Sequence, residues 1–276
     1  MRTLILFIGT LSLAFGDQEA KETIRQNLPA AARLEVDNVH GSIHVSGYNG
    51  SEIQVVAEKT IQAESSERLE AAKREVKLDV SREGDTAVLF VDGPFRCHCE
   101  DHRWGVHENG DRGYWVRFDF DIKVPAATFL KLGTVNSGDI RVENTTGDFD
   151  VSNVNRGIEM TGMSGSGRVH TVNGGIKVLF NKNPSGDCSF GTVNGTIETS
   201  FLPSLNADVR LKTFNGSAYT DYDVTALPMK ASSGTREDGK FVYRTQDFHG
   251  VRIGSGGPTL KYDTLNGNIQ ITKRGQ

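Results

Sequence analysis

Alternation of apolar and polar residues at period two runs through most of the chain. In the segment "ARLEVDNVHGSIHVSGYNGSEIQVVAEKTIQA", polar residues separate Leu34, Val36, Ile43 and Val45, and "HGS" and "YNGS" interrupt the pattern. Such alternation, broken by Asn-Gly or Gly-Ser pairs, is typical of short half-buried strands joined by tight turns. The segments "TAVLFVDG" and "YWVRFDFDIKVP" continue it, so the sequence predicts a mostly β protein.

One segment departs from this pattern. In "AESSERLEAAKREVKLDV" the apolar residues Leu69, Ala72 and Val76 follow helical spacing, good helix formers fill the gaps, and Ser65 or Ser66 can cap. The sequence therefore predicts one helix at about 64–76. Residues 17–32 are polar and rich in alanine, and we expect them to form a lead-in arm.

From about Leu130 onward a short motif recurs, in which an apolar residue is followed by Asn and, in most copies, by Gly. Copies include "HTVNGGIKV", "GTVNGTIETS" and "DTLNGNIQIT". The first five asparagines recur every 18–21 residues and the last follows after 51, while "NVHGSIHV" is an outlying copy with His40 in the Asn position. The predicted repeat corners are Asn136, Asn155, Asn173, Gly174, Asn194, Gly195, Asn215, Gly216, Asn266 and Gly267.

Internal repeats of about 20 residues predict stacked supersecondary units. Two arrangements fit the motif: a β-solenoid with the Asn-Gly corners stacked in a column, or an antiparallel meander joined by Asn-Gly hairpins. The Asn-Gly pair alone favours hairpins, whereas the regular period and the repeated corner favour the solenoid. We expect Gly and Asn at these corners because both tolerate a positive φ.

The order of these segments resembles the bacterial family DUF4097, whose exported members are named as adhesins. The resemblance rests on "RLEVDNVHGSIHVSGYNGSEIQVVAEKTI", the short helix, "FDIKVP" and the units "TVNGGIKV", "TVNGTIETS" and "LNGNIQIT", from about Arg33 to Lys273. It implies a right-handed β-solenoid-like repeat ladder at 129–273, preceded by a β-rich region at 17–128, and it supplies no catalytic residues. The Cys/His-rich loop and the last 51-residue interval depart from the family pattern.

The N-terminus has the features of a secretory signal peptide. "MRTLILFIGTLSLAFG" places Arg2 before an apolar run and ends with Ala14 and Gly16 at small-residue positions, which predicts a signal peptide at 1–16 that is cleaved after Gly16. About a dozen apolar residues are too few to cross a bilayer core of about 30 Å. We therefore expect an exported protein of the periplasm, cell surface or extracellular space, with no transmembrane anchor after cleavage.

Composition narrows the classes of partner. The 276 residues carry a formal net charge of −4, with 31 basic and 35 acidic residues. No segment is dense in Lys or Arg, so the electrostatic footprint of a nucleic-acid-binding protein is missing from the sequence. We expect no nucleic-acid partner.

The most concentrated candidate chemistry lies in a polar loop at 94–113, "PFRCHCEDHRWGVHENGDRG". Thiolate and imidazole are good Zn or Cu ligands, although the spacing matches no standard zinc module. A structural polar loop and a disulfide among Cys97, Cys99 and Cys188 are the alternatives, because exported thiols tend to pair. The candidate metal ligands are Cys97, His98, Cys99, His102 and His107.

These observations favour a non-catalytic, adhesin-like protein that binds an extended partner, such as a glycan, an envelope protein or a surface. No resident cofactor is expected apart from Zn or Cu at the loop, and self-association through the solenoid ends is open, because an uncapped end exposes strand edges. The alternative is a metal-dependent or polysaccharide-acting enzyme that uses the 97–107 loop or one solenoid face. Carboxylates with Lys and Arg on one face would favour that alternative.

Overall fold

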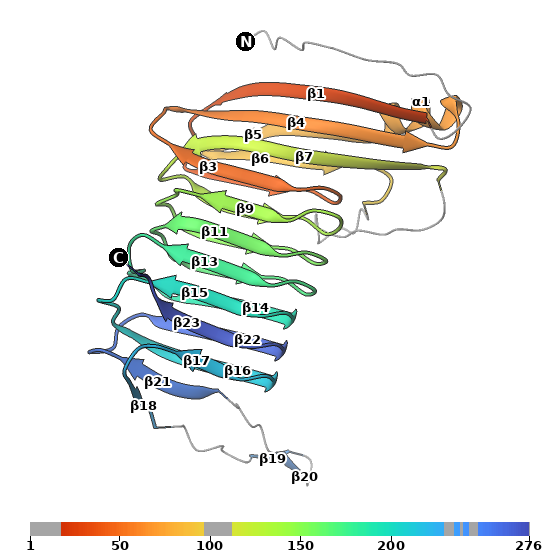
Figure 1. Cartoon of the computed structure of the whole chain (residues 1–276). Coiled ribbons are helices and arrows are strands. Elements are labelled where there is room, and N and C mark those ends of the chain that lie inside the picture. The colour runs from red at the N-terminus through yellow and green to blue at the C-terminus, as the bar shows by residue number, and fades with distance from the viewer. Residues whose placement is uncertain (1–17, 97–111, 229–234, 238–239, 243–247, 276) are drawn as a thin grey trace.

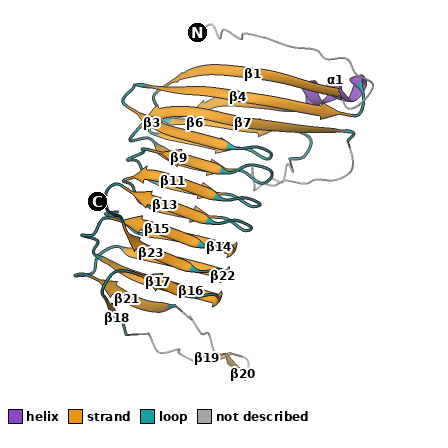
Figure 2. Ribbon diagram, viewed as in Figure 1, coloured by secondary structure: helices purple, strands orange, loops and turns teal. Residues whose placement is uncertain are grey.

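The structure, a computed structural model, describes residues 18–96, 112–228, 235–237, 240–242 and 248–275. Two large sheets dominate it, with one helix, α1 (Ser66–Glu75), near one end (Figures 1 and 2). The predictions of a mostly β chain and of a single helix are confirmed for the described residues. A separate two-stranded sheet joins β19 (Thr235–Glu237) and β20 (Lys240–Val242).

Each large sheet has a spatial order that departs from chain order only near its two ends. The ten-stranded sheet contains, in spatial order, β1 (Gln18–Pro29), β4 (Glu52–Ala63), β7 (Tyr114–Pro125), β3 (Ile43–Tyr48), β9 (Ile140–Glu143), β11 (Ile158–Met163), β13 (Ile176–Phe180), β15 (Ile197–Phe201), β23 (Ile269–Lys273) and β17 (Ala218–Thr220). The eleven-stranded sheet contains β18 (Val224–Ala226), β21 (His249–Ile253), β16 (Ala207–Asn215), β22 (Thr259–Asn266), β14 (Cys188–Asn194), β12 (Gly167–His170), β10 (Phe149–Ser152), β8 (Phe129–Gly133), β2 (Arg33–Asp37), β6 (Thr86–Asp92) and β5 (Lys77–Glu83).

Between β8 and β15 successive strands alternate between the two sheets, and each strand pairs in parallel with its neighbours in the same sheet. The first residues of β9, β11, β13 and β15 lie in register, so Ile140, Ile158, Ile176 and Ile197 follow one another across the sheet. Parallel pairing rules out the antiparallel meander for this region, because two-residue Asn-Gly hairpins join antiparallel strands only.

The core lies between the inward faces of the two sheets. Strands such as β13 alternate buried and outward positions, and Ile176 and Val178 are about 1% exposed. Large rings fill the C-terminal half, where Phe180 stacks on Phe201 with ring centroids 4.7 Å apart. Neither sheet could bury its apolar face alone, so the pairing of the sheets fixes the fold.

The N-terminal strands belong to the same two sheets as the repeat strands β8 to β15. β1 pairs antiparallel with β4 along its whole length, so the expected lead-in arm at 17–32 is wrong. Helix α1 begins after Ser65, whose hydroxyl accepts from the Arg68 N–H, and it buries Leu69 and Ala72. β2 pairs with β8 and β3 pairs with β9, so the sequence division between residues 128 and 129 does not coincide with the edge of either sheet.

The C-terminal strands lie out of chain order. β22 lies between β14 and β16, and β23 lies between β15 and β17. In Figure 1 the blue strands β22 and β23 lie below β14 and β15 and above β16 and β17. The 51-residue interval before the last Asn therefore reflects an insertion, and the last unit of the sequence is the second-last unit in space.

Candidate binding surface

A ladder of asparagine side chains follows the corner at which the chain passes from one sheet to the other. The Nδ2 of each Asn donates to the Oδ1 of the Asn on the neighbouring unit, at 2.6–3.1 Å. All five bonds run in the same direction. The ladder consists, in spatial order, of Asn136, Asn155, Asn173, Asn194, Asn266 and Asn215. His40, in the Asn position of the outlying copy, pairs with Asn136 in a parallel bridge.

A second column of side chains lies two positions before the ladder, where the sequence has Thr or Asn. These side chains point inward and donate to corner carbonyls. Thr192 Oγ1 donates to Gly174 O at 2.9 Å, and Thr264 Oγ1 donates to Gly195 O at 3.2 Å. Both threonines are at most 5% exposed. The corners are therefore held from inside as well as outside, which sequence reasoning missed, although a polar residue at this position in every copy was its signal.

The corner glycines Gly174 and Gly195 are required for close packing and not for a left-handed backbone. An added Cβ on Gly195 would lie 2.0 Å from Gly174 O, and one on Gly174 would lie 2.2 Å from Arg156 O. Neither glycine has a positive φ, and the positive-φ residues other than glycine in the described chain are Ser137 and Asn144. The expectation that ladder Asn residues supply positive φ is wrong. At Gly174 and Gly195 the units stack so closely that no side chain fits beneath the neighbouring carbonyl.

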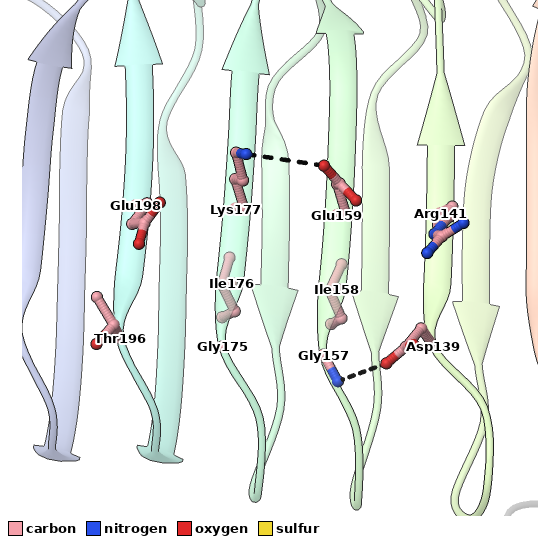
Figure 3. A pocket seen from close by; sticks show the side chains of 10 residues that line it. All are labelled: Asp139, Arg141, Gly157, Ile158, Glu159, Gly175, Ile176, Lys177, Thr196 and Glu198. Atoms are coloured by element: carbon pink, nitrogen blue, oxygen red, sulfur yellow. Dashed lines mark hydrogen bonds and ion pairs between the residues drawn. The ribbon is translucent and has the colours of Figure 1, made fainter.

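The outer face of the ten-stranded sheet carries a shallow groove of about 420 Å³, which we call the charged trough (Figure 3). It crosses β9, β11, β13 and β15. Small residues at the beginning of each strand leave room along it. The trough is lined by Asp139, Arg141, Gly157, Ile158, Glu159, Gly175, Ile176, Lys177, Thr196 and Glu198.

Charge alternates along the trough. Arg141, Glu159, Lys177 and Glu198 lie in register on four adjacent strands, so a cation and an anion follow in turn. Neighbouring strands are about 4.8 Å apart. Glu159 Oε1 lies 3.9 Å from Lys177 Nζ, and both side chains are about half exposed or more, at 46% and 63%. An exposed pair of this kind contributes little to stability, so these charges are available to a partner.

The row of charges continues onto β3 and β7. In the strand register, His44 of β3 lies opposite Arg141 of β9 and opposite Asp121 of β7. The ring nitrogens of His44 lie 3.7 Å from Asp121 Oδ1 and 3.7 Å from Glu143 Oε1. The polar outer surface of this sheet thus extends from the charged trough onto the N-terminal strands β3 and β7.

The Cys/His-rich loop is outside the described residues from 97 to 111, so the predicted ligands Cys97, His98, Cys99, His102 and His107 are not placed and stay a prediction. Cys188 is described and carries a free, buried thiol on β14. The predicted disulfide among Cys97, Cys99 and Cys188 stays a prediction, because Cys97 and Cys99 are outside the described residues. Burial raises the pKa of the Cys188 thiol to about 11. Within the described ranges, no group of three or more His, Cys, Asp or Glu is arranged to hold a metal ion.

A buried ion pair fixes the chain where it enters that loop. Arg96 Nη1 lies 3.1 Å from Asp37 Oδ1, and the two side chains are 3% and 7% exposed. The guanidinium also donates to Val91 O at 2.8 Å and stacks on Phe90 at 4.4 Å. Burial raises the pKa of Asp37 to about 6, although the charge of Arg96 opposes this. Arg96, the last described residue before position 97, is therefore held firmly by the fold.

Residues 1–17, which include the predicted cleavage site Gly16, are outside the described chain. Among the helices that the structure describes, none has the length and apolar character to cross a membrane.

Comparison with known proteins finds only weak likenesses, all of them to solved structures. No protein-family model matches the sequence, and no curated protein matches it. Among solved structures, a provisionally named cell adhesion protein from Clostridium sporogenes ATCC 15579 is 9% identical, with a TM-score of 0.43, over 91% of this chain and 100% of its own. A provisionally named adhesin from Bacteroides fragilis NCTC 9343 is 10% identical, with a TM-score of 0.36, over 91% and 97%.

A third solved structure, provisionally named a lipid binding protein from Parabacteroides distasonis ATCC 8503, is 7% identical, with a TM-score of 0.28, over 92% of this chain and 97% of its own. At such low identities and TM-scores these likenesses support no inference about function. The membership in DUF4097 that the sequence motifs imply stays a prediction.

Proposed function

We propose that the protein is an exported, non-catalytic, adhesin-like protein that binds an extended partner, such as a glycan, an envelope protein or a surface, along the charged trough. The observation that carries this proposal is the register of Arg141, Glu159, Lys177 and Glu198 on four adjacent strands. In this proposal residues 1–16 are a cleaved signal peptide, and residues 129–273 form a right-handed solenoid of about 20-residue units.

The rigidity of the ladder supports a binding role. Backbone hydrogen bonds between parallel strands, the asparagine ladder and the close-packed glycines hold the spacing of the charges constant. A partner that lies across the strands meets a charge of alternating sign at each step of about 4.8 Å. Complementary charges at fixed spacing give specificity and fast association even where each pair contributes little affinity.

A polysaccharide-acting enzyme is the second candidate, and the same face favours it, because carboxylates occur there with Lys and Arg. The exposure of these carboxylates speaks for binding. Glu159 is 46% exposed and lies beside Lys177, and Asp139 Oδ1 accepts the Gly157 N–H at 3.1 Å. A carboxylic acid that works as a general acid depends on burial or on a nearby like charge to hold its proton near neutral pH.

The test is a binding screen with the chain from residue 17 onward, on an array of purified polysaccharides and on immobilised envelope proteins. We expect at least one ligand to lose affinity about tenfold or more when Arg141→Glu and Lys177→Glu are combined, since two favourable charges become repulsive. The matched control combines Arg25→Glu with Lys73→Glu on the N-terminal part and should bind as the unaltered chain does.

Equal binding by the trough variant and the control would contradict the trough as the binding surface. Release of new sugar ends from a bound polysaccharide, abolished by Glu159→Gln with Glu198→Gln, would replace the binding function with the enzymatic one.

A further inference from the structure

The outer face of the eleven-stranded sheet gathers basic residues that are far apart in the sequence. Arg168 on β12, Lys261 on β22 and Arg210 on β16 occupy one register row, with Ser189 of β14 between Arg168 and Lys261. Lys212 lies two residues further along β16. We call Arg168, Arg210, Lys212 and Lys261 the basic row. Its strands lie side by side in the C-terminal half of the molecule (Figure 1).

The basic row is open to solvent and little neutralised. Arg168, Arg210 and Lys261 are exposed, and within the described part of the chain none of the four forms an ion pair. The acidic residues nearest the row on this face are Asp208, Asp263 and Asp150. Asp208 is engaged by Arg252, at 2.7 and 2.8 Å. Asp263 lies opposite Lys212 and Asp150 lies opposite Arg168 in the strand register, with no ion pair within either of these described pairs, and Asp150 also lies opposite Lys131.

A histidine on β12 lies beside the basic row. His170 is two residues from Arg168 on β12, and its Nδ1 lies 3.0 Å from Gly191 O. Partial burial lowers the pKa of His170, and the charge of Arg168 lowers it further, against Asp150 and Asp263.

An aromatic ring fixes two of the lysines. Lys261 Nζ lies 4.8 Å from the centroid of the Phe248 ring, and Lys212 Nζ lies 5.6 Å from it. Such cation–π contacts hold the ammonium groups on the sheet without neutralising them. Ser189 lies within the row and leaves room between Arg168 and Lys261. At the other end, next to Arg210, the Leu227 side chain lies over Gly250.

We propose that the basic row binds an acidic polysaccharide, a chain that carries carboxylate or sulfate groups along its length. Cations in one row across adjacent strands fit a linear polyanion better than a single small anion. A single-stranded nucleic acid stacks its bases on open aromatic faces. The Phe248 ring is occupied by two ammonium groups, and the open ring near the row is Phe214, two residues after Lys212, so the comparison with an oligonucleotide below decides between the two polyanions. An anionic membrane would require apolar side chains beside the cations. Phe214 and Leu265, 78% and 47% exposed, lie beyond the row towards the ends of β16 and β22, so the comparison with anionic vesicles below decides between a membrane and a polysaccharide.

This surface is separate from the charged trough, because the two lie on different sheets. Its test is therefore independent of the proposed function. The chain from residue 17 onward is titrated with polygalacturonate, dextran sulfate and neutral dextran, at low and at physiological salt. We expect binding of the two acidic polymers that weakens steeply with salt, and no binding of neutral dextran.

The variant that tests the row combines Arg168→Ser, Arg210→Ser and Lys261→Ser, which removes three exposed cations without touching the core. We expect its affinity for polygalacturonate to fall about tenfold or more, with a shallower salt dependence, because each cation contributes a separate contact. The matched control combines Lys21→Ser, Arg25→Ser and Arg74→Ser. It removes the same net charge from exposed positions elsewhere and should bind as the unaltered chain does.

Three results would overturn the proposal: no binding of either acidic polymer at low salt, an equal loss in both triple variants, or tighter binding of a single-stranded oligonucleotide or of anionic vesicles through the same three residues. The trough variant Arg141→Glu with Lys177→Glu should leave polygalacturonate binding unchanged. A result against binding at the charged trough is thereby distinguished from a result against binding at the basic row.

Discussion

Replacement of Asn194 by alanine tests whether the asparagine ladder stabilises the fold. Asn194 Nδ2 donates to Asn173 Oδ1 at 2.8 Å, and Asn194 Oδ1 accepts from Asn266 Nδ2 at 2.7 Å. A hydrogen bond contributes ~0.5–1.5 kcal/mol net to folding. Because Asn194 is exposed and water replaces part of each lost bond, we take the lower end for both. Asn194→Ala should therefore lower the free energy of unfolding by about 1 kcal/mol.

Two further variants make the reasoning sharper. Asn215 ends the ladder and makes one ladder bond, to Asn266 Oδ1 at 2.7 Å, so Asn215→Ala should cost about half as much. Asn194→Asp keeps the acceptor for Asn266 but places a carboxylate oxygen against Asn173 Oδ1. It should cost more than Asn194→Ala at neutral pH, and the cost should shrink on acidification, when the protonated carboxyl can donate.

The assay is urea unfolding followed by circular dichroism, supported by thermal melts, in which ~1 kcal/mol corresponds to a shift of ~2–4 °C. The expected order of destabilisation is Asn194→Asp, then Asn194→Ala, then Asn215→Ala. An aspartate variant as stable as the unaltered chain at neutral pH would refute the one-directional ladder, and so would an Asn215→Ala variant that costs as much as Asn194→Ala.

Three other predictions follow from the contacts described above. Gly195→Ala should destabilise the protein by ~3 kcal/mol or more or prevent folding, because its Cβ would lie 2.0 Å from Gly174 O, whereas Gly275→Ala, with nothing within 4 Å, should melt as the unaltered chain does. The pKa of Asp37 is raised to about 6 in the folded state, so on acidification the folded state binds this proton before the unfolded state does. The Asp37 contribution to the free energy of unfolding is therefore lost as pH rises from about 4 through about 6. Asp37→Asn should remove this pH dependence of stability, and an unchanged dependence would assign it to another group. Cys188, buried with its pKa raised to about 11, should resist alkylation in the native state and react on unfolding, as measured by peptide mass spectrometry; rapid native labelling would show that the thiol is accessible.

Much of the ladder could be predicted because its local signal is strong. The apolar–Asn–Gly motif marks each corner, and even the copy with His40 aligns with Asn136 in the fold. The physical reason expected for Gly174 and Gly195 was wrong, because a sequence shows where glycine occurs but not which neighbour lies above it. Close approach between units separated by about 20 residues becomes visible only once the units are stacked.

Pairings between distant segments could not be predicted. The amino-terminal strand β1 was missed because Ala20, Ile24 and Leu28 are spaced among polar residues and only partly buried. The charged trough had a usable signal, since Arg141, Glu159, Lys177 and Glu198 each follow the first isoleucine of a strand. The basic row had none, because its members come from strands whose spatial order differs from their chain order.

The insertion of β22 and β23 has a consequence for how the molecule is completed. A chain made from its N-terminus presents residues 207–220 well before residues 259–273, yet β14 takes β22 as its neighbour, and β16 reaches β14 only through β22. Tyr262, fully buried and stacked on Phe190 at 5.1 Å, enters the core with this last segment. The last two strands therefore complete both sheets. A chain that ends before residue 259 lacks β22 and β23, so β14 and β15 lose the strands that join them to β16 and β17.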